Sequence, residues 1–361
     1  MPTRAQTLTE AARLRSAFEE AGAQSVETPI LQPADLLLDL YGEDIRARAY
    51  VTSDALRGEQ MLRPDFTVPV VQMHMAHGAE PARYTYSGEV FRRQEQDEER
   101  ANEYIQVGYE VFDRTDPAAA DAEVFALFAD LLAPFGLRAA TGDIGILMSA
   151  VAGLNTTDQR KAALMRHIWR PRRFRALLDR YSGRTAPPVT RTALLDGDST
   201  DLEAPEIGLR SRVEVMARID ALRADAEAPA ISKSEIAALD ALLDVRETAP
   251  FAIQQLSDIA IDLPALGAAV DRLKARIAAM ADRGVDVDNL DFEASYGRTQ
   301  MEYYDGFVFG FYAESRPDLP PVASGGRYDA LTERLGVGET IPAVGGVMRP
   351  GLLLELQEGA T

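Results

Sequence analysis

The segment Arg83–Glu110 constrains the fold more than any other part of the chain. Two runs rich in aromatic and β-branched residues, Tyr84–Phe91 and Tyr104–Phe112, flank the strongly charged stretch Gln94–Glu103. Runs of this composition are typical of strands, and a charged stretch between them is typical of a solvated loop. The segment therefore predicts an antiparallel β-hairpin.

Pairing of these two strands predicts a polar site. Side chains repeat every second residue on one face of a strand, so we expect Arg92 to lie near Gln106 and Glu110. An arginine, an amide and a carboxylate on an open sheet face are suited to a small molecule that carries both an anion and an amine. Taken alone, the same residues also fit a surface hairpin with ordinary ion pairs.

Further motifs separate these two interpretations. Phe91-Arg92-Arg93 followed by Gln106-Val107-Gly108-Tyr109-Glu110 resembles motif 2 of the class II aminoacyl-tRNA synthetases, and specifically that of histidyl-tRNA synthetase. The resemblance implies an α+β fold, in which helices flank an antiparallel sheet. Four other stretches follow in the order of that family: Thr28–Ile30, Leu62–Thr67, Glu302–Tyr304 with Ser324–Asp329, and Pro342–Gly345.

The resemblance also implies a histidine-like pocket. In the related enzymes the residue matching Asp65 binds the α-amine of the substrate, and a tyrosine at the position of Tyr328 contacts the imidazole. From the residues alone, Asp65 and Thr67 also fit a cap for a following helix over Val68–Ala76, and the tyrosine pair fits core packing. The candidate ligand-binding residues are Asp65, Thr67, Arg92, Gln106, Glu110, Tyr303, Tyr304 and Tyr328.

The chain departs from the synthetase pattern where that pattern places cations. Leu352 occupies the position of the motif 3 arginine that holds the ATP phosphates, and Arg349 lies three residues earlier, before a proline. Asn102 replaces a loop arginine. Thr299 stands where an arginine for the substrate carboxylate is expected, and Arg298 lies one place too early. Oriented cations stabilise the charge of a phosphoryl-transfer transition state, so we expect no catalytic residues.

Charge and length favour the same interpretation. The chain carries 38 basic and 57 acidic residues, a net charge of −19, and this field repels a nucleic-acid backbone. The basic run Arg166–Arg175 is more typical of a solvated helix face than of a nucleic-acid contact. Only 16 residues follow Gly345, so no anticodon-binding domain is expected.

Together these features resemble the regulatory subunits of ATP phosphoribosyltransferase. The resemblance implies a non-catalytic protein without a cofactor, which activates a short-form catalytic subunit in the first step of histidine biosynthesis. It further implies a hetero-oligomer, specifically a hetero-octamer, self-association as a dimer, and feedback inhibition by L-histidine. The alternative is a ligase that activates an amino acid with ATP; the retained Arg92 favours the ligase and Leu352 counts against it.

Other classes of site are not favoured. The chain has no cysteine and three histidines, His74, His77 and His167. His74 and His77 fit one face of a helix, where packing is more common than metal binding. No run of about 18 apolar residues indicates a membrane span, and the start of the chain lacks the apolar core of a signal peptide. We therefore expect no metal, no membrane contact and a cytoplasmic location.

The order of patterns along the chain predicts a core with one insertion. We expect residues 1–154 and 263–361 to form the core and residues 155–262 to form a mostly helical insertion. Expected core elements include a helix over Thr7–Ala21 and strands over Val26–Ile30, Val285–Phe292 and Phe307–Tyr312. Gly325 and Gly326 are expected to form a tight turn from a strand into a helix.

Overall fold

A computed structural model of the chain describes residues 2–41, 45–94, 100–197, 207–298, 303–336 and 339–359. Part of the predicted loop Gln94–Glu103 lies outside these residues, as does Thr299. The described part combines helices with a mixed sheet, so the predicted α+β class is confirmed. No helix in these ranges is long and apolar enough to cross a bilayer.

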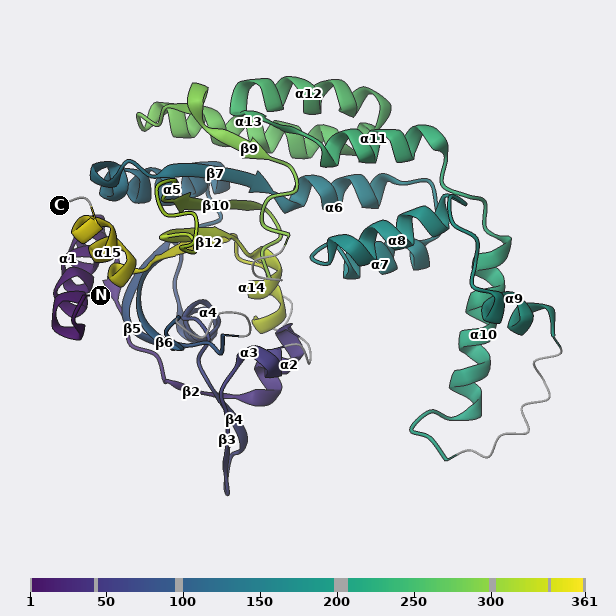
Figure 1. The fold of residues 1–361 in the computed structure, drawn as a ribbon, viewed down its shortest axis with the longest axis horizontal. Coiled ribbons are helices and arrows are strands. Elements are labelled where there is room, and N and C mark those ends of the chain that lie inside the picture. Colours follow the sequence, from purple (N-terminus) through teal and green to yellow (C-terminus); the bar gives the residue numbers. More distant parts are fainter. Residues whose placement is uncertain are drawn as a thin grey trace.

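A large sheet forms the centre of the molecule (Figure 1). Within the described residues it has nine strands in the order β1-β5-β6-β12-β11-β10-β7-β9-β8, mostly antiparallel, with parallel pairs at β1–β5 and β7–β9. A smaller sheet joins three strands in the order β2-β4-β3. The strands of the large sheet are β1 (Gln24–Ser25), β5 (Ala82–Phe91), β6 (Glu103–Phe112), β7 (Arg138–Asp143), β8 (Arg246–Thr248), β9 (Asp291–Glu293), β10 (Phe307–Tyr312), β11 (Ala323–Arg327) and β12 (Ala343–Met348); those of the smaller one are β2 (Leu31–Pro33), β3 (Val51–Asp54) and β4 (Gly58–Leu62).

The predicted hairpin is confirmed as the pair β5–β6. Its register aligns Ala82 with Phe112 and Phe91 with Glu103, so the two strands pair along their full length. Aromatic and β-branched residues fill both strands, which suits a pleated and largely buried surface. Gln106 and Glu110 of the candidate site both lie on β6 of this hairpin.

Helices cover the two faces of the sheet differently. On one face α1 (Arg4–Glu20) and α5 (Pro117–Leu132) pack on β6, and α13 (Gly267–Asp282) packs on α5. Tyr109 shows this contact, because its ring lies 5.3 Å from that of Phe18 and its hydroxyl donates to Glu123 at 2.6 Å. On the other face lie α4 (Thr67–His77) and α14 (Asp329–Leu335), and α15 (Pro350–Gly359) closes the chain against α1.

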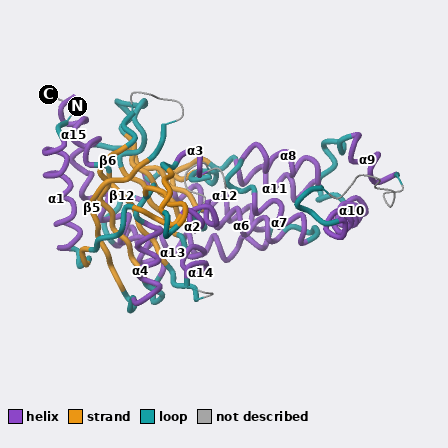
Figure 2. Tube along the Cα trace, turned by 90° about the horizontal axis from the view of Figure 1, so that it is seen from below, coloured by secondary structure: helices purple, strands orange, loops and turns teal. Residues whose placement is uncertain are grey.

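The helical middle of the chain projects from this body (Figures 1 and 2). Beyond α6 (Ile144–Gly153) the projection contains α7 (Asp158–Arg166), α8 (Pro171–Tyr181), α9 (Val189–Asp196), α10 (Arg212–Glu227) and α11 (Lys233–Leu243). Arg160 and Arg191 both contact the carboxylate of Asp225, at 2.6 and 2.5 Å, and so tie α7, α9 and α10 together. In the basic run, Arg175 pairs with Asp240 at 2.5 Å.

The end of the predicted insertion joins the core sheet. β8 pairs antiparallel with β9, and α12 (Ala249–Asp262) packs on α13. The division into a core of 1–154 and 263–361 and an insertion of 155–262 stays a prediction. We propose that the separate part of the insertion ends before Arg246, since β8 is a strand of the large sheet.

Three local predictions were wrong. Val26–Ile30 is not a strand; β1 and β2 lie on either side of it, although the Val26 amide still donates to Thr85. Most of Val285–Phe292 lies outside any strand; it contains the short 3-10 helix Val287–Asn289, and only its end enters β9. Gly325 and Gly326 form no turn, because both lie inside β11.

These glycines are required because neighbouring strands and side chains approach the backbone of β11 closely. A Cβ on Gly325 would lie 2.3 Å from the carbonyl oxygen of Gly345 and 2.5 Å from the Phe309 ring. A Cβ atom cannot lie this close to a backbone oxygen. The strands β11 and β12 can therefore pair in the observed register only if residue 325 has no side chain.

Gly325→Ala is therefore expected to destabilise the fold by about 1–3 kcal/mol or more, because the added methyl group overpacks the sheet. Urea unfolding measures the change. Gly267→Ala is the matched control, since a Cβ there meets open space at the start of α13, and we expect its stability to be unchanged or slightly raised. Equal stability of the two variants would contradict the packing described for β11.

Candidate ligand-binding site

A buried carboxylate forms the centre of the candidate site. Glu110 on β6 is 1% exposed and accepts hydrogen bonds from three hydroxyl groups. Thr67 and Tyr86 donate to its Oε1 at 3.1 and 2.7 Å, and Tyr328 donates to its Oε2 at 2.6 Å. The donors come from α4, β5 and the residue preceding α14, so one side chain connects three separate parts of the chain.

Glycines in the neighbouring strands make space for these large side chains. Gly345 lies opposite Glu110, and a Cβ there would come within 1.5 Å of the Glu110 Oε2. Gly108 lies opposite Tyr86, and a Cβ there would meet the ring at 2.1 Å. The site therefore depends on residues that contribute no side chain at all.

Gln106 lies four residues before Glu110, on the same strand face. Its side chain is fully buried, yet neither Oε1 nor Nε2 has a hydrogen-bond partner within the described ranges. An unsatisfied buried amide costs about 1–3 kcal/mol per group, so such groups are rare unless a ligand or water completes them. A ligand that fits Gln106 offers both a donor and an acceptor.

Tyrosines enclose the other side of the site. The rings of Tyr303 and Tyr304 lie 4.8 Å apart in an edge-to-face arrangement, and the Tyr303 ring lies 6.1 Å from that of Tyr328. Gly326 admits the Tyr304 ring, because a Cβ there would lie 2.8 Å from its Cδ1. Trp169, in the projecting helices, donates to the Tyr304 carbonyl at 3.3 Å and links that region to the site.

The loop before α4 lies over the same sheet face. Asp65 is buried, and its Oδ1 accepts the Val68 amide at 3.4 Å, so the predicted capping role holds for Asp65 as a weak contact. For Thr67 that role is wrong, because α4 begins at Thr67 itself and the hydroxyl donates to Glu110. Arg63 fixes the loop by donating to the carbonyls of Glu89 and Thr28, at 2.8 and 2.6 Å.

The prediction that Arg92 lies beside Gln106 and Glu110 was wrong, because the register of the β5–β6 pair places it elsewhere. Gly88 lies opposite Gln106, and the Arg92 amide bonds to Asn102 beyond the end of β5. Arg92 thus shares the sheet face of Gln106 but lies four residues further along it. Its Nε donates to the Pro64 carbonyl at 2.7 Å, so it also supports the loop that carries Asp65.

Burial dominates the electrostatics of the site. Desolvation raises the pKa of Glu110 to about 7, against the opposing effect of its three hydroxyl donors, and the nearby Asp65 adds to the rise. Burial likewise raises the pKa of the Tyr86, Tyr304 and Tyr328 hydroxyls, which stay protonated, and those of Tyr86 and Tyr328 donate to Glu110. The site therefore holds one carboxyl group with a raised pKa among hydroxyl groups that stay protonated.

The positions that depart from the synthetase pattern can also be located. Leu352 lies in the first turn of α15 and packs against the apolar core. Arg349 precedes that helix, with its guanidinium 5.7 Å from the centre of the Tyr104 ring. Arg298 is buried beneath the projecting helices, where its Nε donates to the Ile168 carbonyl at 2.8 Å and its Nη2 has no partner in the described residues.

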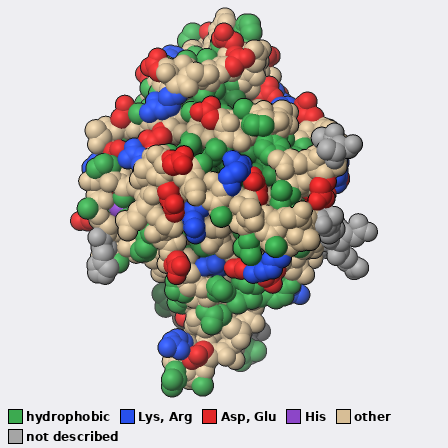
Figure 3. Space-filling model, turned by 90° about the vertical axis from the view of Figure 1, so that its left-hand side faces the viewer, with side chains coloured by type: hydrophobic (Ala, Val, Ile, Leu, Met, Phe, Trp, Pro, Cys, Tyr) green, Lys and Arg blue, Asp and Glu red, His purple; other side chains and the backbone are tan. Residues whose placement is uncertain are grey.

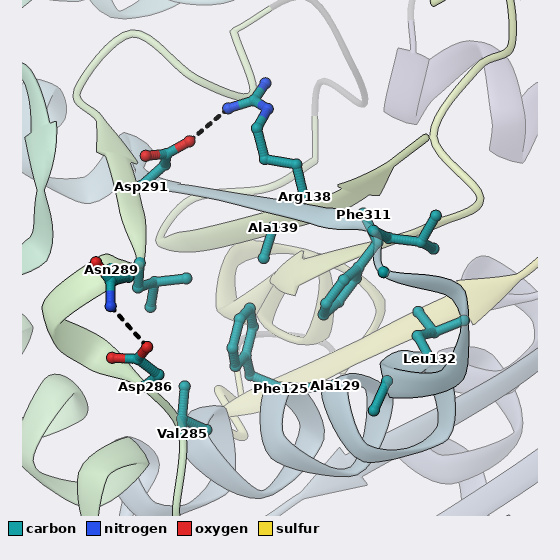
Figure 4. A pocket seen from close by; sticks show the side chains of 14 residues that line it. Phe125, Ala129, Leu132, Arg138, Ala139, Val285, Asp286, Asn289, Asp291 and Phe311 are labelled. Carbon is teal, nitrogen blue, oxygen red and sulfur yellow. Dashed lines mark hydrogen bonds and ion pairs between the residues drawn. The ribbon is translucent and has the colours of Figure 1, made fainter. Parts of the chain in front are cut away.

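A separate hollow of about 340 Å³ lies at the far end of the sheet (Figure 4). Phe125 and Phe311 form its apolar side, and Arg138 paired with Asp291 at 2.6 Å lies at its rim. None of the candidate ligand-binding residues lines it. In the described ranges there is also no group of three histidine or acidic side chains placed to hold a metal ion.

Two contributors to the site were missed from the sequence. Tyr86 donates directly to Glu110, and Gly345 makes the space in which that carboxylate lies. Tyr86 was assigned only to a strand, although the alternation of β5 places it on the face of Gln106 and Glu110 once the register is known. A glycine within a predicted strand is itself a sign of close approach.

Comparison with known proteins first defines the class. The sequence profile of the histidyl-tRNA synthetase family matches residues 1–228 and 215–351. A structure from Bacillus halodurans, described as an ATP phosphoribosyltransferase regulatory subunit/histidyl-tRNA synthetase, superposes with a TM-score of 0.67 at 20% identity and covers 99% of this chain and 80% of its own. A histidine–tRNA ligase subunit from Alicyclobacillus acidocaldarius superposes with a TM-score of 0.61 at 23% identity. The match covers 100% of this chain and 95% of that one. The histidyl-tRNA synthetase-like class II fold predicted from the motifs is thus confirmed.

Sequence relatives then define the family. A protein from Brucella anthropi is 32% identical over 356 residues, covering 92% of this chain and 93% of its own length. A protein from Mesorhizobium japonicum is 33% identical over 356 residues, covering 93% of this chain and 94% of its own length. Both are described as ATP phosphoribosyltransferase regulatory subunits. The chain belongs to this family of regulatory subunits.

The raised pKa of Glu110 predicts a pH dependence of stability. Because the folded pKa, about 7, exceeds the usual value of 4.5, the folded state binds more protons between these values. The free energy of unfolding should therefore fall as pH rises from about 5 to 8, by an amount of the order of 3 kcal/mol from this group.

Glu110→Gln removes this titration, so the difference in stability between wild type and variant should change across that pH range. Urea unfolding at several pH values measures it. Asp305, whose pKa burial also raises to about 7, is present in both proteins and its contribution cancels. A stability difference that is flat from pH 5 to 8 would contradict the burial of an ionisable carboxyl at this position.

Proposed function

We propose that this chain is a non-catalytic subunit that activates a short-form ATP phosphoribosyltransferase catalytic subunit and makes it sensitive to histidine. In this role it is required for the first step of histidine biosynthesis. Relatives named as regulatory subunits, at about 32% identity over more than nine-tenths of both chains, support the assignment. The site geometry supports the ligand.

The observation that carries the ligand proposal is the unsatisfied amide of Gln106. Its oxygen needs a donor and its nitrogen needs an acceptor. A free α-amino acid offers both, as an ammonium and a carboxylate on one carbon. Asp65 lies buried at the same pocket and its negative charge favours the ammonium.

The aromatic part of the pocket fits an imidazole. Tyr303, Tyr304 and Tyr328 form a wall of rings, and the Glu110 carboxyl behind them accepts hydrogen bonds. An imidazole is flat and carries an N–H donor, so it stacks on such rings and donates to such an oxygen. Thr67 and Arg92 act from the edge of the pocket, through Glu110 and through the loop that holds Asp65.

The assembly is proposed as a hetero-oligomer, with the hetero-octamer of the family as the expected form. Exposed apolar side chains gather around the small sheet, at the lower end of the face in Figure 3: Ile30, Leu31, Val51 and Leu56, the last 92% exposed. A group of exposed apolar side chains is typical of a subunit contact, and we propose it as the face of self-association. With a net charge of −19, no nucleic-acid or membrane partner is proposed.

Histidine regulates such an assembly only if it binds the active and inhibited states with different affinity. Couplings of this type are typically about 1–3 kcal/mol, or about 5- to 150-fold in affinity. Trp169, which bonds to the Tyr304 backbone, gives the projecting helices a direct contact with the pocket through which such a difference can act.

The test uses Gln106→Leu, a change of similar shape. Removing the amide should weaken histidine binding by about 10- to 100-fold, since one or two charge-assisted hydrogen bonds are lost. Stability should stay equal or rise, because two unsatisfied buried atoms are gone. Calorimetry measures binding, and urea unfolding measures stability. In a mixture with the catalytic subunit, the variant should still activate but should resist inhibition by histidine.

Gln254→Leu, on the exposed face of α12, is the matched control and should leave binding, activation and inhibition unchanged. Unaltered histidine binding by the Gln106 variant would refute the ligand proposal. A catalytic subunit whose activity does not respond to the wild-type chain would refute the regulatory one.

A further inference from the structure

The turn between α7 and α8, in the projecting helices of Figure 2, carries a basic surface on an acidic chain. Arg166 ends α7, and Arg172 and Arg173 lie in the first turn of α8. All three side chains are exposed, and none of them forms an ion pair or a hydrogen bond with another described residue. The chain has 19 more acidic than basic residues, so this surface is opposite in sign to the molecule as a whole.

Two further features concentrate positive charge at this turn. Burial lowers the pKa of His167, and the charges of three neighbouring arginines, Arg170, Arg173 and Arg166, lower it further. The amino end of α8 adds the positive end of a helix dipole, which disfavours cations in the first turn. Arg172 and Arg173 therefore lie where they add nothing to the stability of their helix, and the surface suits a negatively charged partner.

The inner side of the same turn is tied to the candidate site. The Ile168 carbonyl accepts a hydrogen bond from the Nε of Arg298 at 2.8 Å. The indole of Trp169 donates to the Tyr304 carbonyl at 3.3 Å. One short segment thus presents arginines to solvent and contacts the wall of the proposed histidine pocket with the residues between them.

We propose that the surface formed by Arg166, Arg172 and Arg173 binds an acidic surface of the catalytic subunit. The inference rests on the proposed function and names the place at which that partner docks. Guanidinium groups pair with carboxylates through two parallel N–H donors, and complementary charge guides two proteins into one orientation. A protein is favoured over a nucleic acid, because three arginines match a few carboxylates, whereas the net charge of −19 repels a long phosphate backbone.

This position also gives the proposed regulation a short path. A subunit bound to the arginines contacts the turn whose Trp169 bonds to Tyr304, so a single turn of chain separates the docked partner from the pocket wall. If histidine binds the docked and the free chain with different affinity, it changes the affinity for the partner by the same factor, because coupling between two binding sites is reciprocal.

The test measures association of the full chain with the catalytic subunit as the salt concentration is raised. A double variant, Arg172→Glu with Arg173→Glu, should associate about tenfold more slowly at low salt, since like charges then meet, and the difference from wild type should shrink as salt increases. Its stability in urea should be unchanged or slightly raised, because acidic residues are favoured in the first turn of a helix. Arg172→Lys with Arg173→Lys keeps the charges and should lose much less.

Arg272→Glu with Lys274→Glu, on the exposed face of α13, is the matched control, because it makes the same change in net charge. This control should associate like wild type, and histidine binding should be unchanged in every variant. Equal slowing in the control would overturn the inference, since association would then follow net charge alone. An arginine double variant that associates as fast as wild type would overturn it as well.

Two further outcomes are distinguished by the same proteins. A structured RNA that binds wild type but not the Arg172→Glu, Arg173→Glu variant, with association of the catalytic subunit intact, would assign the surface to nucleic acid and refute the inference. A wild-type chain that neither binds nor activates the catalytic subunit would refute the proposed function itself. Failure of the docking surface alone leaves wild-type activation in place, so the two failures can be told apart.

Discussion

The hydrogen bonds to Glu110 are the interaction on which the site depends. A carboxylate that is 1% exposed is stable only when donors surround it, and here three hydroxyl groups from α4, β5 and the start of α14 do so. Each donor is held by its own element, and Gly345 leaves the space that the carboxylate fills. The arrangement thus joins sheet, loop and helix at one buried side chain.

Within that pocket, satisfied and unsatisfied groups have different roles. Glu110 and its three hydroxyl donors form a hydrogen-bonded network that holds its shape without a ligand. Gln106, four residues away, has no hydrogen-bond partner for either of its polar side-chain atoms within the part of the chain that the structure describes. The contrast suits a binding protein, because the shape is preorganised and the unmet hydrogen bonds are left for the ligand. It is less suited to adenylation, where Leu352 packs in the core at the position from which a synthetase holds triphosphate.

Much of the fold was predictable from local pattern and motif order. The hairpin β5–β6, the strand Phe307–Tyr312 and the helix α1 follow from periodicity, because each has a clear apolar stripe or alternation. The failures share a physical cause. Gly325 and Gly326 resemble a turn in sequence, and only the approach of β10 and β12 shows why a central strand needs them.

Some of the site residues were likewise predictable from the sequence, and others were not. Thr67, Glu110 and Tyr328 were expected together from the family motifs and are directly hydrogen-bonded. Arg92 was misplaced because a strand's face can be read from sequence, whereas its register depends on the partner strand and on where the pairing stops. Tyr86 was missed for the same reason. What a residue contacts across the sheet is set by distant segments that no local pattern reports.

We propose that a synthetase-shaped site holds an amino acid without activating it. The most direct measurement is histidine-dependent exchange of labelled pyrophosphate into ATP by the purified chain, beside a histidyl-tRNA synthetase under the same conditions. We expect no exchange above background at saturating histidine and ATP, because Leu352 and Thr299 stand where the reaction needs cations. Robust histidine-dependent exchange that is lost in Arg92→Leu would contradict it and would make the chain an amino-acid-activating ligase.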